Sequence, residues 1–399
     1  MPLRTLEDLG AVAGSRAFVR LDLNVPLEGG DVLDDTRIRA AIPTVNELLG
    51  LGCSVVAASH LGRPKGHVVE ELRLAPVADR LSSLLERDVL ALDASTGPDA
   101  RAVCDHVEPG EVVVLENLRF DPREEANDPA LAAELGELAD VYVGDAFGAA
   151  HRAHASVAAL PERFLDQGRP AVAGRLVERE VSALDRLLED PARPYVAVLG
   201  GVKVSDKLST IGALVERVDA LLIGGAMAFT FLASEGGDVG SSILEAERFD
   251  DVRAARERAS ERGVAIVLPE DVVAAPEISA EAPTTTVAAT EIPEGLLGLD
   301  IGPRTVEAFA EVIAGARTVL WNGPMGVVEL EPFQAGTRGV AEAIANATAY
   351  TVAGGGDSLA AVKRFGLGAS FDHLSTGGGA SLEFLEGREL PGLSVLEAR

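Results

Sequence analysis

The sequence predicts an α/β protein with two doubly wound, mainly parallel (Rossmann-like) domains, joined by a helix and separated by a cleft. Its 399 residues exceed what one hydrophobic core usually holds. Short, nearly continuous apolar runs alternate with longer amphipathic stretches, and this alternation repeats in both halves of the chain. Apolar strands separated by helices are typical of parallel sheets that are covered on both faces.

The apolar runs place the strands. In the first half we expect strands at 17–21, 54–58, 112–115 and 141–143. In the second half we expect strands at 195–199, 220–223, 264–268, 318–321 and 350–353. Helical patterns such as residues 131–138 lie between them. Residues 279–290 are rich in Ala, Thr and Pro, and we interpret them as a loop plus an edge strand.

One helix connects the predicted domains. From Ala173 to Leu188, leucine and valine recur at helical spacing, and Asp190-Pro191 ends the pattern. We therefore predict a first domain over residues 1–172, an interdomain helix over 173–190 and a second domain over 191–380.

Composition excludes several classes of protein. The formal net charge is −28, which argues against nucleic acid and membrane surfaces as partners. No apolar run is long enough to span a bilayer and no signal core follows Met1, so we expect a cytoplasmic protein. Two cysteines are too few for a disulfide framework. The acidic composition and the scarcity of lysine favour a protein from a salt-accumulating cell, because high salt screens the repulsion between its charges. The alternative is an acidic protein from an ordinary mesophilic organism.

Basic residues follow the ends of several predicted strands in the first half. In open parallel sheets, ligands bind outside the carboxyl ends of the strands. Any one of these residues taken alone could form an ordinary surface ion pair. Together they predict a crevice for a small, multiply charged anion, because arginine forks match carboxylate and phosphate oxygens. They are Arg37, His60, Arg63, Arg119 and Arg152.

In the second half of the chain, glycine-rich turns rather than arginines follow the predicted strands. Triple-glycine turns at 354–356 and 377–379 follow apolar runs and precede helices, where backbone amides can hold phosphate, although a tight turn alone would explain either. Asp357 is either a helix cap or a ligand for the Mg²⁺ of a nucleotide. Lys203 and Lys207, half of the chain's four lysines, follow a strand where they can meet a phosphoryl group. His151 and His154 lack a nearby third ligand, so we do not favour a metal site there.

Taken together, the motifs of this chain resemble those of the phosphoglycerate kinases over essentially its full length. The segments that carry the resemblance are Arg20–Pro26, Ser59–Pro64, Glu116–Phe120, Asp145–Gly148, His151–His154, Gly200–Lys207, Gly224–Phe231, Trp321–Gly326, Gly354–Asp357 and Ser375–Glu383. The resemblance implies a first domain that binds 3-phosphoglycerate, a second that binds ADP or ATP, and a final segment over 381–399 that packs back towards the first. Val202 and Ser358 depart from the alanine and threonine that are common in the family.

The resemblance also assigns residues. For 3-phosphoglycerate or 1,3-bisphosphoglycerate it implies Asp22 and Asn24 at the hydroxyl and carboxyl end, and the five basic residues above at the phosphate. For the nucleotide it implies Lys207 at the phosphates, Asp357 on Mg²⁺ and Glu329 at the ribose. The remaining nucleotide-binding residues are Lys203, Gly224, Gly225, Asn322, Gly354, Gly355, Gly356 and Ser358.

We expect catalysis by alignment and charge neutralisation during an in-line transfer. Our hypothesis gives that task to Lys203 and Arg37, with backbone amides around Gly355 and Gly378. The two domains would close like a hinge to bring the substrates in line. One alternative is a non-catalytic sensor of nucleotide and organic anion, and another is a kinase or ligase for a different carboxylate. Self-repulsion and the resemblance both favour a monomer.

Overall fold

A computed structural model describes residues 2–398 of the chain. The chain divides into two compact units. Unit 1 comprises residues 1–182 and 389–399, and unit 2 comprises residues 183–388. The structure groups residues 381–388 with unit 2, because α14 (Gly379–Leu385) packs against α8 (Leu208–Val215).

Unit 1 is built on a six-stranded sheet with the order β5-β6-β4-β1-β7-β8, in which all neighbours are parallel. The predicted strands form its centre, and two three-residue strands that were not predicted form its edges. Its strands are β1 (Arg16–Leu21), β4 (Ser54–Ala58), β5 (Val89–Ala91), β6 (Val112–Val114), β7 (Val141–Asp145) and β8 (Ala171–Ala173).

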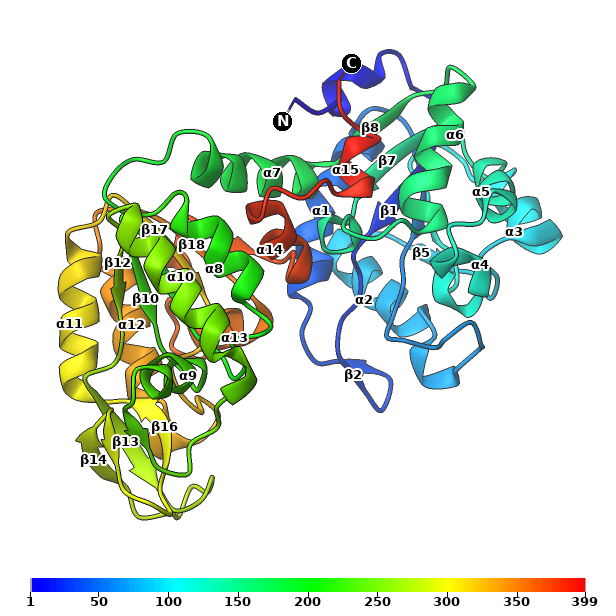
Figure 1. Ribbon diagram of the computed structural model, residues 1–399. Helices are drawn as coiled ribbons and strands as arrows, with labels where there is room; N and C mark the ends of the chain where they lie inside the picture. The colour runs from blue at the N-terminus through cyan, green and yellow to red at the C-terminus, as the bar shows by residue number, and fades with distance from the viewer. Residues whose placement is uncertain (1, 399) are drawn as a thin grey trace. The chain divides into compact units, whose positions relative to one another are not determined.

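Helices cover both faces of this sheet. Apolar residues of α1 (Thr36–Gly50) and α2 (Ala75–Leu85) pack on one face. On the other face lie α5 (Pro129–Gly136) and α6 (Leu160–Asp166), where Phe18 of β1 stacks on Tyr142 of β7 with ring centroids 6.0 Å apart (Figure 1). The other helices of unit 1 are η1 (Leu6–Leu9), η2 (Glu70–Leu72), α3 (Gly97–Cys104), η3 (Leu118–Phe120), α4 (Pro122–Glu125), η4 (Phe147–Ala149), η5 (Ala155–Ala159, a π-helix) and α15 (Pro391–Ser394), and a hairpin joins β2 (Leu27–Glu28) to β3 (Asp31–Val32).

Unit 2 repeats the plan with a second six-stranded parallel sheet, order β12-β10-β9-β17-β18-β19. One face packs on α11 (Pro303–Ala314), α12 (Ala335–Ala345) and α13 (Gly356–Arg364). Helices α8 and α10 (Phe249–Glu261) pack together on the other face (Figure 1). The strands are β9 (Tyr195–Leu199), β10 (Ala220–Ile223), β12 (Ala265–Val267), β17 (Thr318–Asn322), β18 (Tyr350–Gly354) and β19 (His373–Ser375). The predicted fold class is confirmed, with two parallel sheets between helices.

A smaller antiparallel sheet extends unit 2, with the order β14-β13-β16. The edge strand predicted within residues 279–290 is confirmed as β14 (Thr285–Ala288). The other segments of this region are β13 (Asp271–Ala275), β16 (Leu297–Ile301), α9 (Met227–Ser234), η6 (Ala246–Arg248), the pair β11 (Asp238–Val239) and β15 (Glu291–Ile292), η7 (Glu331–Phe333) and η8 (Gly368–Ser370).

The connecting helix α7 (Arg175–Leu188) starts two residues later than predicted, because Ala173 belongs to β8. Asp145, at the end of β7, sets this start: its Oδ1 accepts the amides of Leu176 and Val177 at 2.8 and 3.2 Å. Burial raises the pKa of Asp145 to about 6. None of the helices described between residues 2 and 398 is long and apolar enough to cross a membrane.

Candidate active site

Asp22 and Arg37 form the best-defined ion pair among the predicted residues of unit 1. Asp22 follows β1 and is almost completely buried, whereas Arg37 lies in the first turn of α1. Arg37 Nη1 is 2.9 Å from both carboxylate oxygens of Asp22. Among residues 2–398, only this nitrogen of the Arg37 guanidinium has a hydrogen-bond partner, so its other N–H groups remain available to a ligand.

Asn24 and Arg119 together hold the loop that follows β4. The side-chain oxygen of Asn24 accepts the amide of Gly62 at 2.9 Å. Arg119 Nη1 donates to the carbonyl oxygen of the same glycine, also at 2.9 Å. Arg119 is buried, and this burial lowers the pKa of its guanidinium despite the nearby carboxylate of Glu125. The segments after β1, β4 and β6 therefore meet at one edge of the sheet.

His60 faces a residue that the sequence analysis left without a role. Arg20, near the carboxyl end of β1, is 1% exposed and its Nη2 lies 3.2 Å from Nδ1 of His60. Its Nε donates to Ser156 Oγ at 2.8 Å, and that serine also contacts the buried carboxylate of Glu124. The pKa of His60 lies well below its usual range, first because of burial and then because of the charges of Arg20, Arg119 and Arg37.

The two remaining predicted arginines of unit 1 are exposed and have fewer contacts with the rest of the unit. Arg152 is exposed and its Nε lies 3.1 Å from His151 Nε2. Its charge reaches the buried His154, whose pKa falls to about 4 through burial and the charges of Arg119, Arg20 and Arg152. Arg63 is exposed and forms no ion pair with the residues described here. Neighbouring residues thus hold five of the predicted side chains in place, those of Asp22, Asn24, Arg37, His60 and Arg119. The side chains of Arg63 and Arg152 reach into solvent.

In unit 2, the first glycine turn lies beside Asn322. Gly355 has φ +91° and precedes α13, and a Cβ there would lie 3.0 Å from Asn322 Nδ2. The first amides of α13, from Gly356 to Ser358, have no partner within the helix and point out of its N-terminus. Lys207 Nζ contacts Asn322 Oδ1, and burial lowers the pKa of this lysine to about 8. Asn322 therefore lies between Lys207 and the glycine turn at the start of α13.

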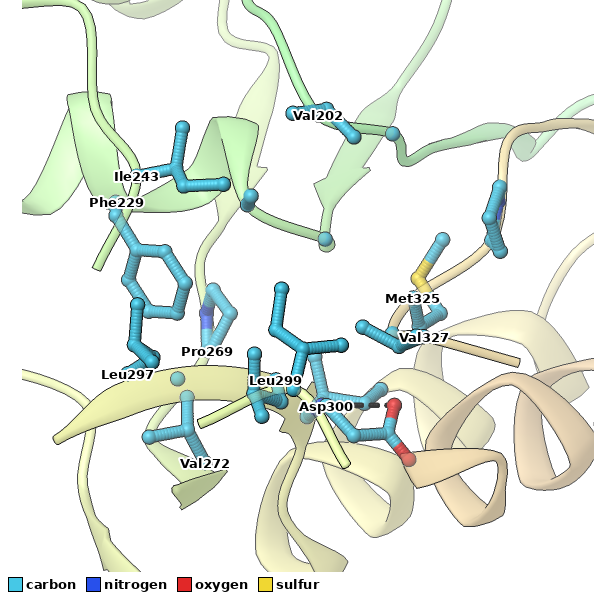
Figure 2. A pocket seen from close by; sticks show the side chains of 18 of the residues that line it. Val202, Phe229, Ile243, Pro269, Val272, Leu297, Leu299, Asp300, Met325 and Val327 are labelled. Atoms are coloured by element: carbon cyan, nitrogen blue, oxygen red, sulfur yellow. Dashed lines mark hydrogen bonds between the residues drawn. The ribbon is translucent and has the colours of Figure 1, made fainter. Parts of the chain in front are cut away.

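A pocket of about 250 Å³ opens in the same unit (Figure 2). Of the predicted residues, Gly225, Glu329 and Asp357 line it. Gly224 is not among the lining residues, but it packs against one of them, because a Cβ there would lie 2.4 Å from the sulfur of Met325. The remaining walls are mostly aliphatic, and the large apolar side chains Val202, Ile243 and Ile278 are exposed at this pocket. Such an apolar slot with few polar groups suits the flat ring of a nucleobase.

Three predicted residues show features that the sequence did not indicate. Ser358 is fully buried and its hydroxyl accepts the amide of Gly323 at 2.6 Å, so only its backbone is left for a ligand. Lys203 is exposed, and its charge reaches Glu245. Gly378 has φ +56° and precedes α14.

A phosphotransferase needs groups that neutralise phosphate charge. Basic side chains cluster in the first α/β unit, and a lysine, a glycine turn and an apolar pocket occur in the second, so the structure fits that class of enzyme. The family model described as phosphoglycerate kinase matches residues 6–388. The chain belongs to the phosphoglycerate kinase family.

Named relatives agree with this assignment. The chain is 54% identical to the phosphoglycerate kinase of Roseiflexus castenholzii over 398 residues, which cover 99% of both chains. It is 53% identical to that of Herpetosiphon aurantiacus over 397 residues, again 99% of each. The structure of phosphoglycerate kinase from Coxiella burnetii superimposes with a TM-score of 0.88 at 40% identity, covering 99% of each chain. The comparisons give no support to the alternative of a non-catalytic sensor.

Proposed function

We propose that the chain catalyses reversible phosphoryl transfer between 1,3-bisphosphoglycerate and Mg-ADP, which gives 3-phosphoglycerate and ATP. The observation that carries this proposal is the basic cluster of unit 1. In a chain of net charge −28, Arg20 and Arg119 lower the pKa values of both buried histidines, while Arg37 acts on His60 and Arg152 on His154. Nearby carboxylates balance part of this positive charge, and an anionic ligand would balance the rest.

For the acid substrate, we assign Asp22 and Asn24 to the hydroxyl and carboxyl end, and Arg37 to the phosphate groups. Because one guanidinium nitrogen of Arg37 is engaged by Asp22, its orientation is fixed before the ligand arrives. His60 and Arg119 address the remote phosphate from buried positions. Arg63 and Arg152, which are exposed, reach it from the solvent side.

For the nucleotide, we assign the base to the apolar pocket, beside Gly224 and Gly225, and the ribose to Glu329. The phosphates extend to Lys207, Asn322 and the N-terminus of α13. There, Gly354 and Gly355 allow close approach, and the amides of Gly356, Asp357 and Ser358 donate. Lys203 lies on the segment that leads to Lys207.

The residues near this phosphate space fit a magnesium ion. Asp357 is exposed, lines the nucleotide pocket and has no hydrogen-bond or ion-pair partner among residues 2–398. Mg²⁺ uses one or two carboxylates with phosphate oxygens, so a single free carboxylate beside a phosphate space is a suitable donor set. The ion would supply charge neutralisation on the nucleotide oxygens.

For the chemical step, we assign Lys203 and Arg37 to neutralising the transferred group, with the backbone amides around Gly355 and Gly378. An acyl phosphate is already activated, so positioning and electrostatics are sufficient and no covalent enzyme intermediate is needed. Because the two substrates are assigned to different units, the units close on each other during the cycle to exclude water.

We further propose a cytoplasmic monomer that is adapted to high salt. The net charge of −28 makes copies of the chain repel one another, which favours a monomer. Dissolved ions screen the repulsion between charges within one chain, so high salt should stabilise the fold.

A coupled assay tests these points together. We expect ATP-dependent phosphorylation of 3-phosphoglycerate in the presence of Mg²⁺, rising from dilute buffer to molar KCl. Circular dichroism at each KCl concentration separates folding from catalysis. Protein that is folded and fully active in dilute buffer would refute the salt adaptation alone. Folded protein without turnover at any salt concentration would refute the assigned reaction.

A further inference from the structure

Asp300 is a buried carboxylate in the wall of the nucleotide pocket. It lies near the end of β16, is 3% exposed and is labelled among the lining residues in Figure 2. Its Oδ2 accepts the amide of Gly336 at 2.6 Å, and its Oδ1 accepts that of Ile301 at 3.0 Å. It forms no ion pair with any residue that the structure describes. Burial raises the pKa of Asp300 to about 7, although the two backbone amides act in the opposite direction. Keeping this carboxyl group in the interior therefore costs free energy.

Two glycines are pressed against this carboxylate from different elements. A Cβ at Gly326 would lie 2.3 Å from Asp300 Oδ1, and a Cβ at Gly336 would lie at the same distance. Gly326 belongs to the loop after β17, and Gly336 is the second residue of α12. The carboxylate is therefore enclosed between β16, the loop and the helix, and it can move only if one of them moves.

The loop that follows β17 is fixed on both sides. The amide of Val327 donates to the carbonyl of Leu299 on β16 at 2.9 Å. The amide of Met325 donates to Thr337 Oγ1 on α12 at 3.0 Å. Asp300 completes this clamp, because it joins β16 to α12 directly.

The same loop forms one wall of the pocket. Residues 324–327 and Glu329 line it, as do the exposed Ile243 and Ile278 from other segments. Asn322, which meets Lys207, immediately precedes the loop. The position of this wall therefore governs the width of the base pocket.

We infer that Asp300 is a positioning residue for the nucleotide: by clamping the 324–329 wall between β16 and α12, it sets the affinity for ADP and ATP. Both of its oxygens are occupied by backbone amides, so it acts through the wall rather than by contact. This inference rests on the proposed assignment of the pocket to the nucleotide.

The test uses Asp300→Asn, which preserves shape but has only one acceptor oxygen for the two amides. The single tryptophan, Trp321, provides the readout, because it is buried and its indole donates to Gly323 at the start of the loop. We expect quenching titrations with ADP to show roughly tenfold weaker binding, about the loss of one hydrogen bond to a charged group. KM for ATP should rise equally, while kcat and KM for 3-phosphoglycerate stay unchanged.

Asp271→Asn is the matched control. Asp271 is equally buried and also accepts helix amides, those of Arg304 and Thr305 at the start of α11, but its carboxylate does not contact the wall. It should lose stability without losing affinity for ADP. Wild-type affinity in Asp300→Asn, or an equal loss of affinity in Asp271→Asn, would overturn the inference.

A second variant covers the case in which Asp300→Asn does not fold. Thr337→Val keeps the side-chain volume but removes the acceptor for Met325, so weaker ADP binding supports the clamp and unchanged binding refutes it. If the wild-type protein itself does not bind ADP, the nucleotide assignment of the pocket fails, and this inference fails with it. If the wild type binds ADP and both variants bind it with the same affinity, the inference about Asp300 is refuted while the nucleotide assignment stands.

Discussion

The guanidinium of Arg20 and the imidazole of His60 meet at 3.2 Å in the interior of unit 1. Arginine has no acceptor and stays protonated, so the ring nitrogen Nδ1 must accept this hydrogen bond. His60 is therefore neutral and carries its proton on Nε2. The low pKa of His60 agrees with this state. The imidazole can then donate a hydrogen bond to an anion without adding a further charge to a crowded basic cluster.

We expect Arg20→Lys to damage this arrangement although the charge is kept. A lysine cannot reach Ser156, the carbonyl of Leu21 and His60 together, as the guanidinium does. The free energy of unfolding should fall by about 2–3 kcal/mol, as for a lost buried hydrogen bond to a charged group. KM for 3-phosphoglycerate should rise while KM for ATP does not. Denaturation curves and steady-state kinetics check both.

Arg16→Lys is the control on the same strand. Arg16 forms partly exposed ion pairs with Asp105 and Asp140 at the other end of β1, so its replacement should cost less than about 1 kcal/mol. Equal kinetic effects from both variants would contradict the role given to Arg20.

The pKa of His154 predicts a loss of stability in acid. Its folded-state pKa, about 4, lies below the ordinary value of 6.5, so the unfolded chain binds the proton more readily. The contribution is complete above pH 6.5 and is lost as pH falls towards 4, by about 1.4 kcal/mol per pH unit. His154→Gln should remove this slope. Urea denaturation of both proteins between pH 4 and 7 measures the difference, and a pH-independent difference would exclude this origin.

Lys207 predicts a pH dependence of nucleotide binding in the alkaline range. Burial lowers its pKa to about 8, so its positive charge is present below that pH and is lost above it. KM for ATP should rise several-fold between about pH 7 and pH 9 as the ammonium group deprotonates. Lys207→Arg, which keeps its charge, should give a flatter profile. An equally steep rise in that variant would assign the effect to another group.

Lys203→Ala tests the assignment of the chemical step. If Lys203 meets the transferred group only in the transition state, kcat should fall by about 10²–10³ while the KM values of both substrates change little. Lys65→Ala, which removes another exposed lysine, should leave kcat unchanged. An unaltered kcat in Lys203→Ala would remove this residue from the catalytic step.

The sequence predicted the central strands because their apolar runs are continuous, as in Tyr195–Leu199, which is buried at every position. It did not predict the edge strands β5, β8 and β19. These strands have three residues each, and Val89–Ala91 is only partly buried. Ala171–Ala173 is buried at every position, so for β8 it is the shortness of the apolar run that leaves too weak a pattern.

The candidate site was predictable where a residue type at a strand end indicates its own chemistry, as for Arg119 or Asp357. It was not predictable where a role depends on a distant partner. Arg20 is held by Ser156, which lies 136 positions away in the sequence. Ile243 and Ile278 lie outside the helices and strands, so no periodicity marks them as parts of one pocket.

Residues 389–398 complete unit 1, although they follow unit 2 in the sequence. The carbonyl of Leu396 accepts the amide of Arg4, and Glu397 pairs with Leu3 in a single antiparallel bridge. During synthesis, residues 183–388 are therefore made between the two parts of unit 1. Unit 1 can make these closing contacts only after unit 2 has been synthesised.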